Sequence, residues 1–141
     1  MITLVLFLIA GILNAAMDKI AFTFDNSIFS KLNPLFWDVR ISWKNQYKQP
    51  LRPSTPKWYY FKIFQPPYEE TFPYSSSALV MFTDAWHLAK FLMLVCLCCG
   101  AVCYQPLLTG FLDFVLFYLA FTVTFTIFYT KIFDKRFYGK K

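Results

Sequence analysis

The chain has little of what most catalytic and metal-binding motifs require. It contains a single histidine, His87, and only four glycines among its 141 residues. The glycines are too scattered to form a phosphate-binding loop, and no G-x-S-x-G, H-E-x-x-H or paired C-x-x-C motif occurs. These shortages exclude the usual sequence signatures of nucleotide-binding loops, α/β-hydrolases, zinc proteases and structural zinc sites.

Charged residues are also scarce, at 16% of the chain, whereas hydrophobic residues make up 57%. Two apolar runs lie at residues 91–104 and 106–129, and a third opens the chain at residues 2–16. A helix needs roughly 20 apolar residues to cross about 30 Å of bilayer hydrocarbon. Residues 106–129 satisfy this length with one charge, Asp113. The sequence predicts a single-domain, all-α integral membrane protein with three transmembrane helices near residues 2–22, 78–104 and 106–129.

The placement of basic residues predicts the orientation. Residues 24–77 carry seven of the fourteen lysines and arginines and residues 131–141 carry five, whereas the turn at residues 104–106 carries none. We expect the first apolar segment to be retained, because no basic residue precedes it and Asn14-Ala15-Ala16 is a poor signal-peptide cleavage site. With three spans, the loop at residues 24–77 and the tail at residues 131–141 lie on the same side of the membrane. The positive-inside rule predicts a multi-pass protein with its N-terminus outside and its C-terminus in the cytoplasm.

The loop at residues 25–77 is predicted to be an ordered, aromatic-rich cytoplasmic layer. Its basic residues are interleaved with aromatic ones such as Trp37, Trp43 and Tyr47, and its prolines interrupt any long helix. Residues 57–64 could form a short strand or a surface helix. Basic and aromatic residues together can bind nucleic acid. Beside transmembrane helices, the same pattern favours contact with anionic lipid headgroups, so we expect the bilayer and no nucleic acid as a partner.

The four cysteines lie within eight residues of one predicted helix, at positions 96, 98, 99 and 103. A disulfide is not expected, because cysteines along one helix rarely meet the required geometry and no cysteine exists elsewhere. A thiolate metal site that includes Asp113 is conceivable. We favour small, polarisable packing residues, because no zinc-site spacing occurs.

Three ionisable residues are predicted to meet at the cytoplasmic end of the bundle. Asp18 lies near the end of the first helix, while Asp84 and His87 lie one turn apart at the start of the second. Two carboxylates and an imidazole could act as an acid–base pair or bind a divalent metal. We expect residues 37–47 to cover them and Asn14 to donate a hydrogen bond to Asp18. In the alternative interpretation they are separate interfacial anchors, with Asp84 capping its helix.

Small residues predict where the helices approach one another. Gly11, Asn14, Ala15 and Asp18 share one face of the first helix, which would admit a neighbouring helix closely. The short turn at residues 104–106 predicts that the second and third spans pack against each other, with Gly100 and Gly110 at their contact. Asp113 is expected to lie alone, about 12 Å from that turn.

Three polar stretches interrupt the apolar pattern. They are Asn14-Ala15-Ala16-Met17-Asp18, then Phe36-Trp37 with Ser42-Trp43-Lys44-Asn45-Gln46-Tyr47-Lys48, and Thr83-Asp84-Ala85-Trp86-His87-Leu88. Together they resemble a family of small uncharacterised membrane proteins of Bacteroidota and their phages. The resemblance covers most of residues 14–88 and leaves the last helix unsupported. That family has no assigned activity, so the resemblance implies only that these stretches belong to one pattern.

Three classes of function fit these features. The size, the small-residue face and the lack of a strong motif favour an accessory or structural subunit of a membrane assembly, as a homo-oligomer or in a larger complex. A membrane-bound enzyme or metal site would use Asp18, Asp84 and His87. A holin-like phage pore former fits the short length and basic tail, but a fifty-residue ordered loop is unusual in that class.

Overall fold

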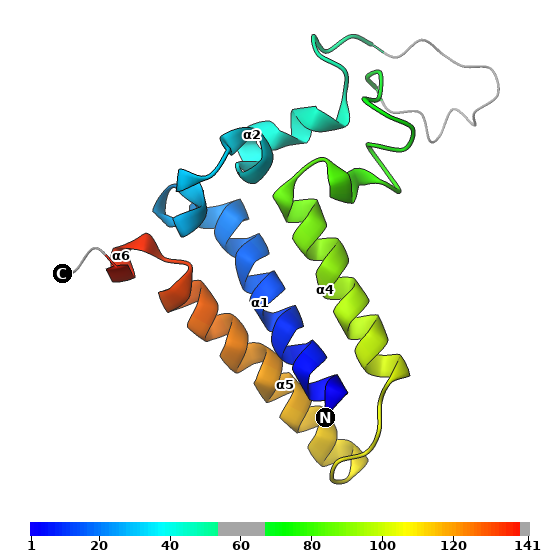
Figure 1. Cartoon of the computed structure of the whole chain (residues 1–141), viewed down its shortest axis with the longest axis vertical. Coiled ribbons are helices and arrows are strands. Elements are labelled where there is room, and N and C mark those ends of the chain that lie inside the picture. Colours follow the sequence, from blue (N-terminus) through cyan, green and yellow to red (C-terminus); the bar gives the residue numbers. More distant parts are fainter. Residues whose placement is uncertain (54–66, 139–141) are drawn as a thin grey trace.

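Three long apolar helices form a bundle in the computed structural model, and the first lies between the other two (Figure 1). The structure describes residues 1–53 and 67–138. Helix α1 covers Ile2–Thr23, α4 covers Ala85–Val102, and α5 covers Gly110–Ile127 and continues as a π-helical turn, η6, over Phe128–Ile132. All three are long and apolar enough to cross a membrane. The described residues contain no strand, which confirms the predicted all-α membrane fold.

Short helical segments form the connections. They are η1 (Phe24–Asn26), η2 (Ile28–Lys31), α2 (Pro34–Trp37), α3 (Val39–Ser42), η3 (Trp43–Gln46), η5 (Val80–Phe82) and α6 (Lys135–Tyr138). All of them lie at one end of the bundle, opposite the N-terminus (Figure 1). The connection between α4 and α5 lies at the other end, as the predicted three-span topology requires.

The loop that follows α1 is built against the helix ends. Trp37 stacks on Phe29 with ring centroids 5.0 Å apart, and both pack on a core that includes Ile20 and Ala85. Asn45 donates a hydrogen bond of 3.0 Å to the carbonyl of Thr83, just before α4. These contacts confirm an ordered aromatic loop for the part of residues 25–77 that the structure describes. The predicted strand or surface helix at residues 57–64 lies outside the described residues.

The boundaries of the second and third spans differ from the prediction. Helix α4 begins at Ala85 instead of residue 78, because the extended backbone of Asp84 interrupts the chain and its side chain caps the new helix. Helix α5 begins at Gly110 instead of residue 106. The connection at residues 103–109 is therefore longer than the predicted turn. The Thr3 hydroxyl donates to the carbonyl of Cys103 at 3.2 Å, which joins this connection to the start of α1.

The predicted hairpin between the second and third spans is wrong. Helices α4 and α5 each pack against α1 and make little contact with each other. A Cβ atom added to Gly100 would lie 3.2 Å from the ring of Phe7 in α1, while one added to Gly110 would meet no atom within 4 Å. The longer connection lets the two helices separate, and α1 fills the space between them.

Helix α1 can lie in the middle because it presents two faces with small residues. Thr3, Ala10 and Met17 are buried at heptad spacing, on the side where Thr3 contacts the end of α4. Gly11 and Ala15 are buried on a second side, where Gly11 meets the backbone of Phe121 in α5. Small residues let helix backbones approach closely in a membrane. This confirms the predicted role of Gly11 and Ala15.

Replacing Gly11 with alanine should separate α1 from α5. The new Cβ would lie 2.5 Å from the carbonyl oxygen of Phe121, which is backbone and cannot rotate away. We expect the free energy of unfolding, measured by SDS titration in mixed micelles, to fall by about 1–3 kcal/mol. Gly110→Ala is the matched control and should cause no loss, because its Cβ would enter open space. Equal effects of the two substitutions would contradict this packing.

Candidate functional site

The best candidate for a chemically active site is an aspartate–histidine pair, Asp84 and His87, at the start of α4. One carboxylate oxygen of Asp84 accepts a hydrogen bond of 2.9 Å from the backbone N–H of His87. The other oxygen lies 2.7 Å from Nδ1 of His87 and accepts a bond of 3.2 Å from the Thr83 hydroxyl. The Trp86 ring packs edge-on against the imidazole at 4.9 Å. The single histidine of the chain is therefore held in one orientation.

This pair has the geometry of an oriented base. Asp84 is 2% exposed, whereas the His87 side chain is 29% exposed. Burial raises the pKa of Asp84, but hydrogen bonds from His87 and Thr83 outweigh it and leave the pKa below its usual value. An ionised aspartate at Nδ1 would keep the proton there and leave Nε2 as the acceptor. Such an imidazole could accept a proton or bind one metal ion.

Asp18 is not joined to this pair. Within the described part of the chain, the Asp18 side chain forms no hydrogen bond or ion pair. The predicted hydrogen bond from Asn14 to Asp18 is therefore absent there. The same residues include no group of three histidine, cysteine or acidic side chains that could hold a metal. The four cysteines are free, and Cys98, Cys99 and Cys103 are exposed. A catalytic or metal role for Asp18, Asp84 and His87 together remains a prediction.

A second polar site, which the sequence did not indicate, lies where α1 meets the C-terminal segment. The Lys19 ammonium forms an ion pair of 2.9 Å with Asp134, and both side chains are almost fully buried, at 2% and 7% exposure. Asp134 also accepts hydrogen bonds from the Arg136 guanidinium, and Lys19 lies over the Tyr129 ring. Arg136 and Lys19 hold the pKa of Asp134 well below its usual range. The only sequence signal for this site was Asp134, a single acidic residue within the basic tail.

Another buried carboxylate, Asp113, is also paired, and its predicted isolation is wrong. It accepts hydrogen bonds from the Tyr104 hydroxyl at 2.8 Å and from the backbone N–H groups of Leu107 and Leu108 at 3.0 Å. The adjacent carboxylate raises the pKa of Tyr104. Asp113 lies in the first turn of α5, so it fixes the connection from α4 and satisfies backbone donors that lipid would leave unpaired.

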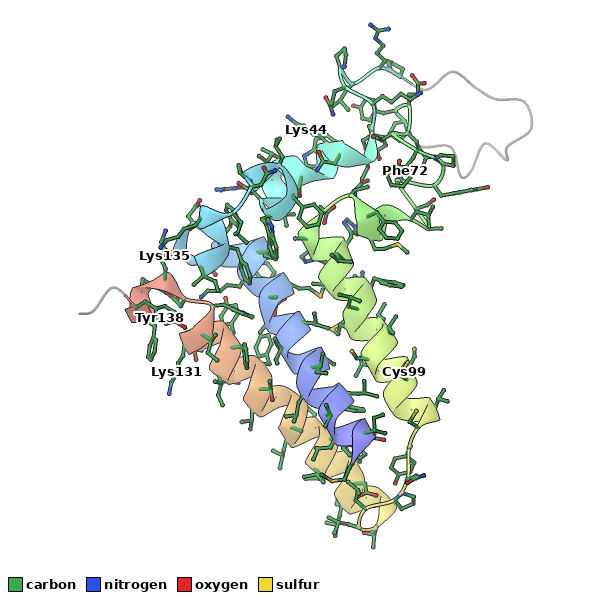
Figure 2. The ribbon with its side chains drawn as sticks, viewed as in Figure 1. Lys44, Phe72, Cys99, Lys131, Lys135 and Tyr138 are labelled. Atoms are coloured by element: carbon green, nitrogen blue, oxygen red, sulfur yellow. The ribbon has the colours of Figure 1, made fainter. Side chains whose placement is uncertain are left out.

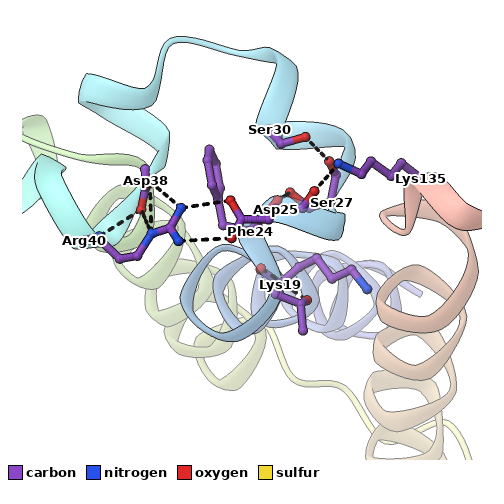
Figure 3. Close-up of polar contacts among 9 residues, drawn as sticks. Lys19, Phe24, Asp25, Ser27, Ser30, Asp38, Arg40 and Lys135 are labelled. Carbon is purple, nitrogen blue, oxygen red and sulfur yellow. Dashed lines mark hydrogen bonds and ion pairs between the residues drawn. The ribbon is translucent and has the colours of Figure 1, made fainter.

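A cluster of charges, with Arg40 and Asp25 exposed and Asp38 buried, holds the loop at the other end of the bundle. The Arg40 guanidinium lies between Asp25 and Asp38 and donates hydrogen bonds to both carboxylates (Figure 3). These bonds lower the pKa of Asp38. Lys135 reaches across from α6 and donates to the backbone carbonyl of Asp25. The segment after α1 is therefore held by α3 on one side and by α6 on the other.

No known protein-family model, curated protein or solved structure matches the chain. The resemblance to the Bacteroidota and phage family therefore stays a prediction. The three apolar helices identify the chain as a small multi-pass membrane protein.

Removing the carboxylate of Asp134 should destabilise the protein more than removing the charge of Lys19. Asp134→Asn leaves Lys19 buried without a counter-charge, which costs about 3–5 kcal/mol. In Lys19→Met, Asp134 still pairs with Arg136, so the loss should be smaller. SDS titration measures the free energy of unfolding of both variants. Equal losses in Asp134→Asn and Lys19→Met would contradict this prediction.

The same pair predicts a dependence on pH. Because the pKa of Asp134 is lowered in the folded state, its stabilising effect is complete above the unfolded value of about 3.9. That effect is lost as the pH falls through the lowered pKa. Asp134→Asn should lack this part of the acid destabilisation.

Proposed function

We propose that this protein is an accessory or structural subunit of a membrane assembly. The observation that carries the proposal is a pair of polar side chains in α1, Asn14 and Asp18. They lie one turn apart on the same side of the helix, are half-buried, and have no hydrogen-bond partner within the described part of the chain. Asn14 lies nine residues before the end of α1, about 13 Å into the span.

Other polar groups in the spans support this interpretation by contrast. The hydroxyls of Thr124, Thr126 and Thr130 each donate to a carbonyl one turn earlier in the same helix. Asp113 has three donors. An asparagine side chain in hydrocarbon commonly bonds across to a neighbouring helix. A partner helix that presents a hydroxyl, amide or carbonyl group at this depth would satisfy Asn14 and Asp18.

Asn14→Leu should weaken association without weakening the fold. The substitution removes no hydrogen bond within the described chain, so the free energy of unfolding should not fall. One interhelical hydrogen bond is worth about 1–2 kcal/mol in a membrane, so the association constant should drop roughly 5- to 30-fold. Chemical cross-linking and co-purification from native membranes measure the association. The adduct mass distinguishes a second copy of this chain from a different subunit.

Thr126→Val is the matched control, because Thr126 is exposed and already bonded to its own helix. It removes a polar group from a spanning helix and should leave association unchanged. A lone wild-type chain in native membranes, or a loss of stability in Asn14→Leu with no loss of association, would contradict the proposal.

The Asp84–His87 pair favours a second candidate, a membrane-bound enzyme that acts near the bilayer surface. An imidazole oriented by a buried carboxylate should be unusually nucleophilic at Nε2. Because His87 is the only histidine, its reaction with diethyl pyrocarbonate can be followed directly. If the pair is catalytic, His87 should react faster than free N-acetylhistidine, and Asp84→Asn should remove this difference. Asparagine can still cap the helix. If His87 reacts no faster than N-acetylhistidine in both the wild type and Asp84→Asn, Asp84 serves only as a helix cap.

We infer that the N-terminus lies outside and that the loop and tail lie in the cytoplasm, which the distribution of basic residues supports. With the four native cysteines replaced by serine, Lys44→Cys should react with a membrane-impermeant maleimide only after cells are permeabilised. Gln105→Cys, at the opposite end, should react in intact cells. The reverse pattern would overturn this orientation.

A further inference from the structure

The segment after α1 and the C-terminal segment form one connected unit at the loop end of the bundle. The backbone N–H of Ile28 donates to the carbonyl of Phe133 at 3.0 Å, and Ser27 pairs with Asp134 in an antiparallel bridge. Asp134 of this bridge also forms the buried ion pair with Lys19. The positions of η2 and α6 are thus fixed relative to each other by backbone and buried contacts.

A pocket of about 490 Å³ lies between these two elements. It is lined by Ile28 and Lys31 from η2 and by Lys135 and Tyr138 from α6. Figure 2 shows Lys135 and Tyr138 at this corner of the molecule, beside the end of the third span. Two ammonium groups, one phenol and one apolar side chain therefore surround a single space.

The cations of this pocket are not neutralised by nearby acids. Lys31 forms no ion pair with any described residue. Lys135 donates to a backbone carbonyl, which leaves its positive charge uncompensated. Of the acids close by, Asp134 is shared by Lys19 and Arg136, and Asp25 pairs with Arg40. The pocket is positive and suited to an anion.

The position of the pocket just beyond the ends of two candidate spans favours a lipid as the source of that anion. The first candidate span ends at Asn26 and the third at Ile132. Lys31 and Lys135 follow these ends by a few residues, at the level of lipid headgroups. A tyrosine and an isoleucine at the same place match a boundary between headgroup and acyl chain.

We propose that this pocket binds the phosphate of an anionic phospholipid headgroup. Lys31 and Lys135 contact the phosphate, the Tyr138 hydroxyl donates to a headgroup oxygen, and Ile28 packs on the first carbons of the acyl chain. The unit built on Asp134 holds the two lysines in place. This inference rests on the membrane location and is independent of a partner helix at Asn14.

The test is a calorimetric titration of the detergent-solubilised full chain with short-chain phosphatidylglycerol. A lysine near an anionic lipid contributes about a fivefold change in affinity. We expect Lys31→Gln and Lys135→Gln each to weaken binding about fivefold and the double variant about 25-fold. Lys31→Gln isolates the effect of charge, because the described structure gives that side chain no other bond. Lys44→Gln, an exposed lysine at the same end, should bind as the wild type does.

Three results would overturn the proposal. If Lys31→Gln retains full affinity, or if Lys44→Gln loses as much, the pocket is not the site. If short-chain phosphatidylcholine binds equally well, the cations do not select the ligand. If inorganic phosphate alone binds with the affinity of phosphatidylglycerol, the site serves a soluble anion and not a lipid.

Discussion

The close approach of α1 and α5 at Gly11 is the constraint on which the rest of the structure depends. An added Cβ there would lie 2.5 Å from the Phe121 carbonyl oxygen, so only glycine allows this separation. With α5 on that side and α4 on the other, α1 separates two helices that follow each other in sequence. The connection at residues 103–109 must then span a wider gap. It is shaped by hydrogen bonds to Asp113, because unpaired backbone groups are costly beside lipid.

The polar side chains of the bundle fall into two groups, those with hydrogen-bond partners and those without one among the described residues. Asp113, Asp134 and Lys19 are buried, and each is bonded to groups that are distant in sequence or lie in an adjacent turn. Asn14 and Asp18 are less buried and are unbonded among the described residues. The chain therefore pairs its buried charges internally, while two polar groups on a spanning helix stay open to a hydrogen bond from another helix. This contrast supports an accessory subunit more strongly than it supports an isolated pore former.

The pairing of Asp84 with His87 was predictable because the two residues are three positions apart at the start of α4, where the side chain of an N-cap aspartate reaches the residue three positions later. Asp18 was placed with them by depth, which does not determine the direction of a side chain around its helix. The Lys19–Asp134 pair was missed for a different reason: its members are 115 positions apart, and no local pattern joins them. Gly11 was correctly assigned to a helix contact, and the structure identifies the partner, which the prediction left open, as α5.

The sequence by itself determined the number of spans, their location and their helical character, because apolar length and backbone hydrogen bonding leave a bilayer-spanning segment few alternatives. It also determined that the basic residues gather at one end. Only the tertiary structure decided that α1 lies in the middle, which buried charges pair, and that Lys31 and Lys135 line one pocket. These features depend on side-chain direction and on contacts between distant segments, and both are set by packing.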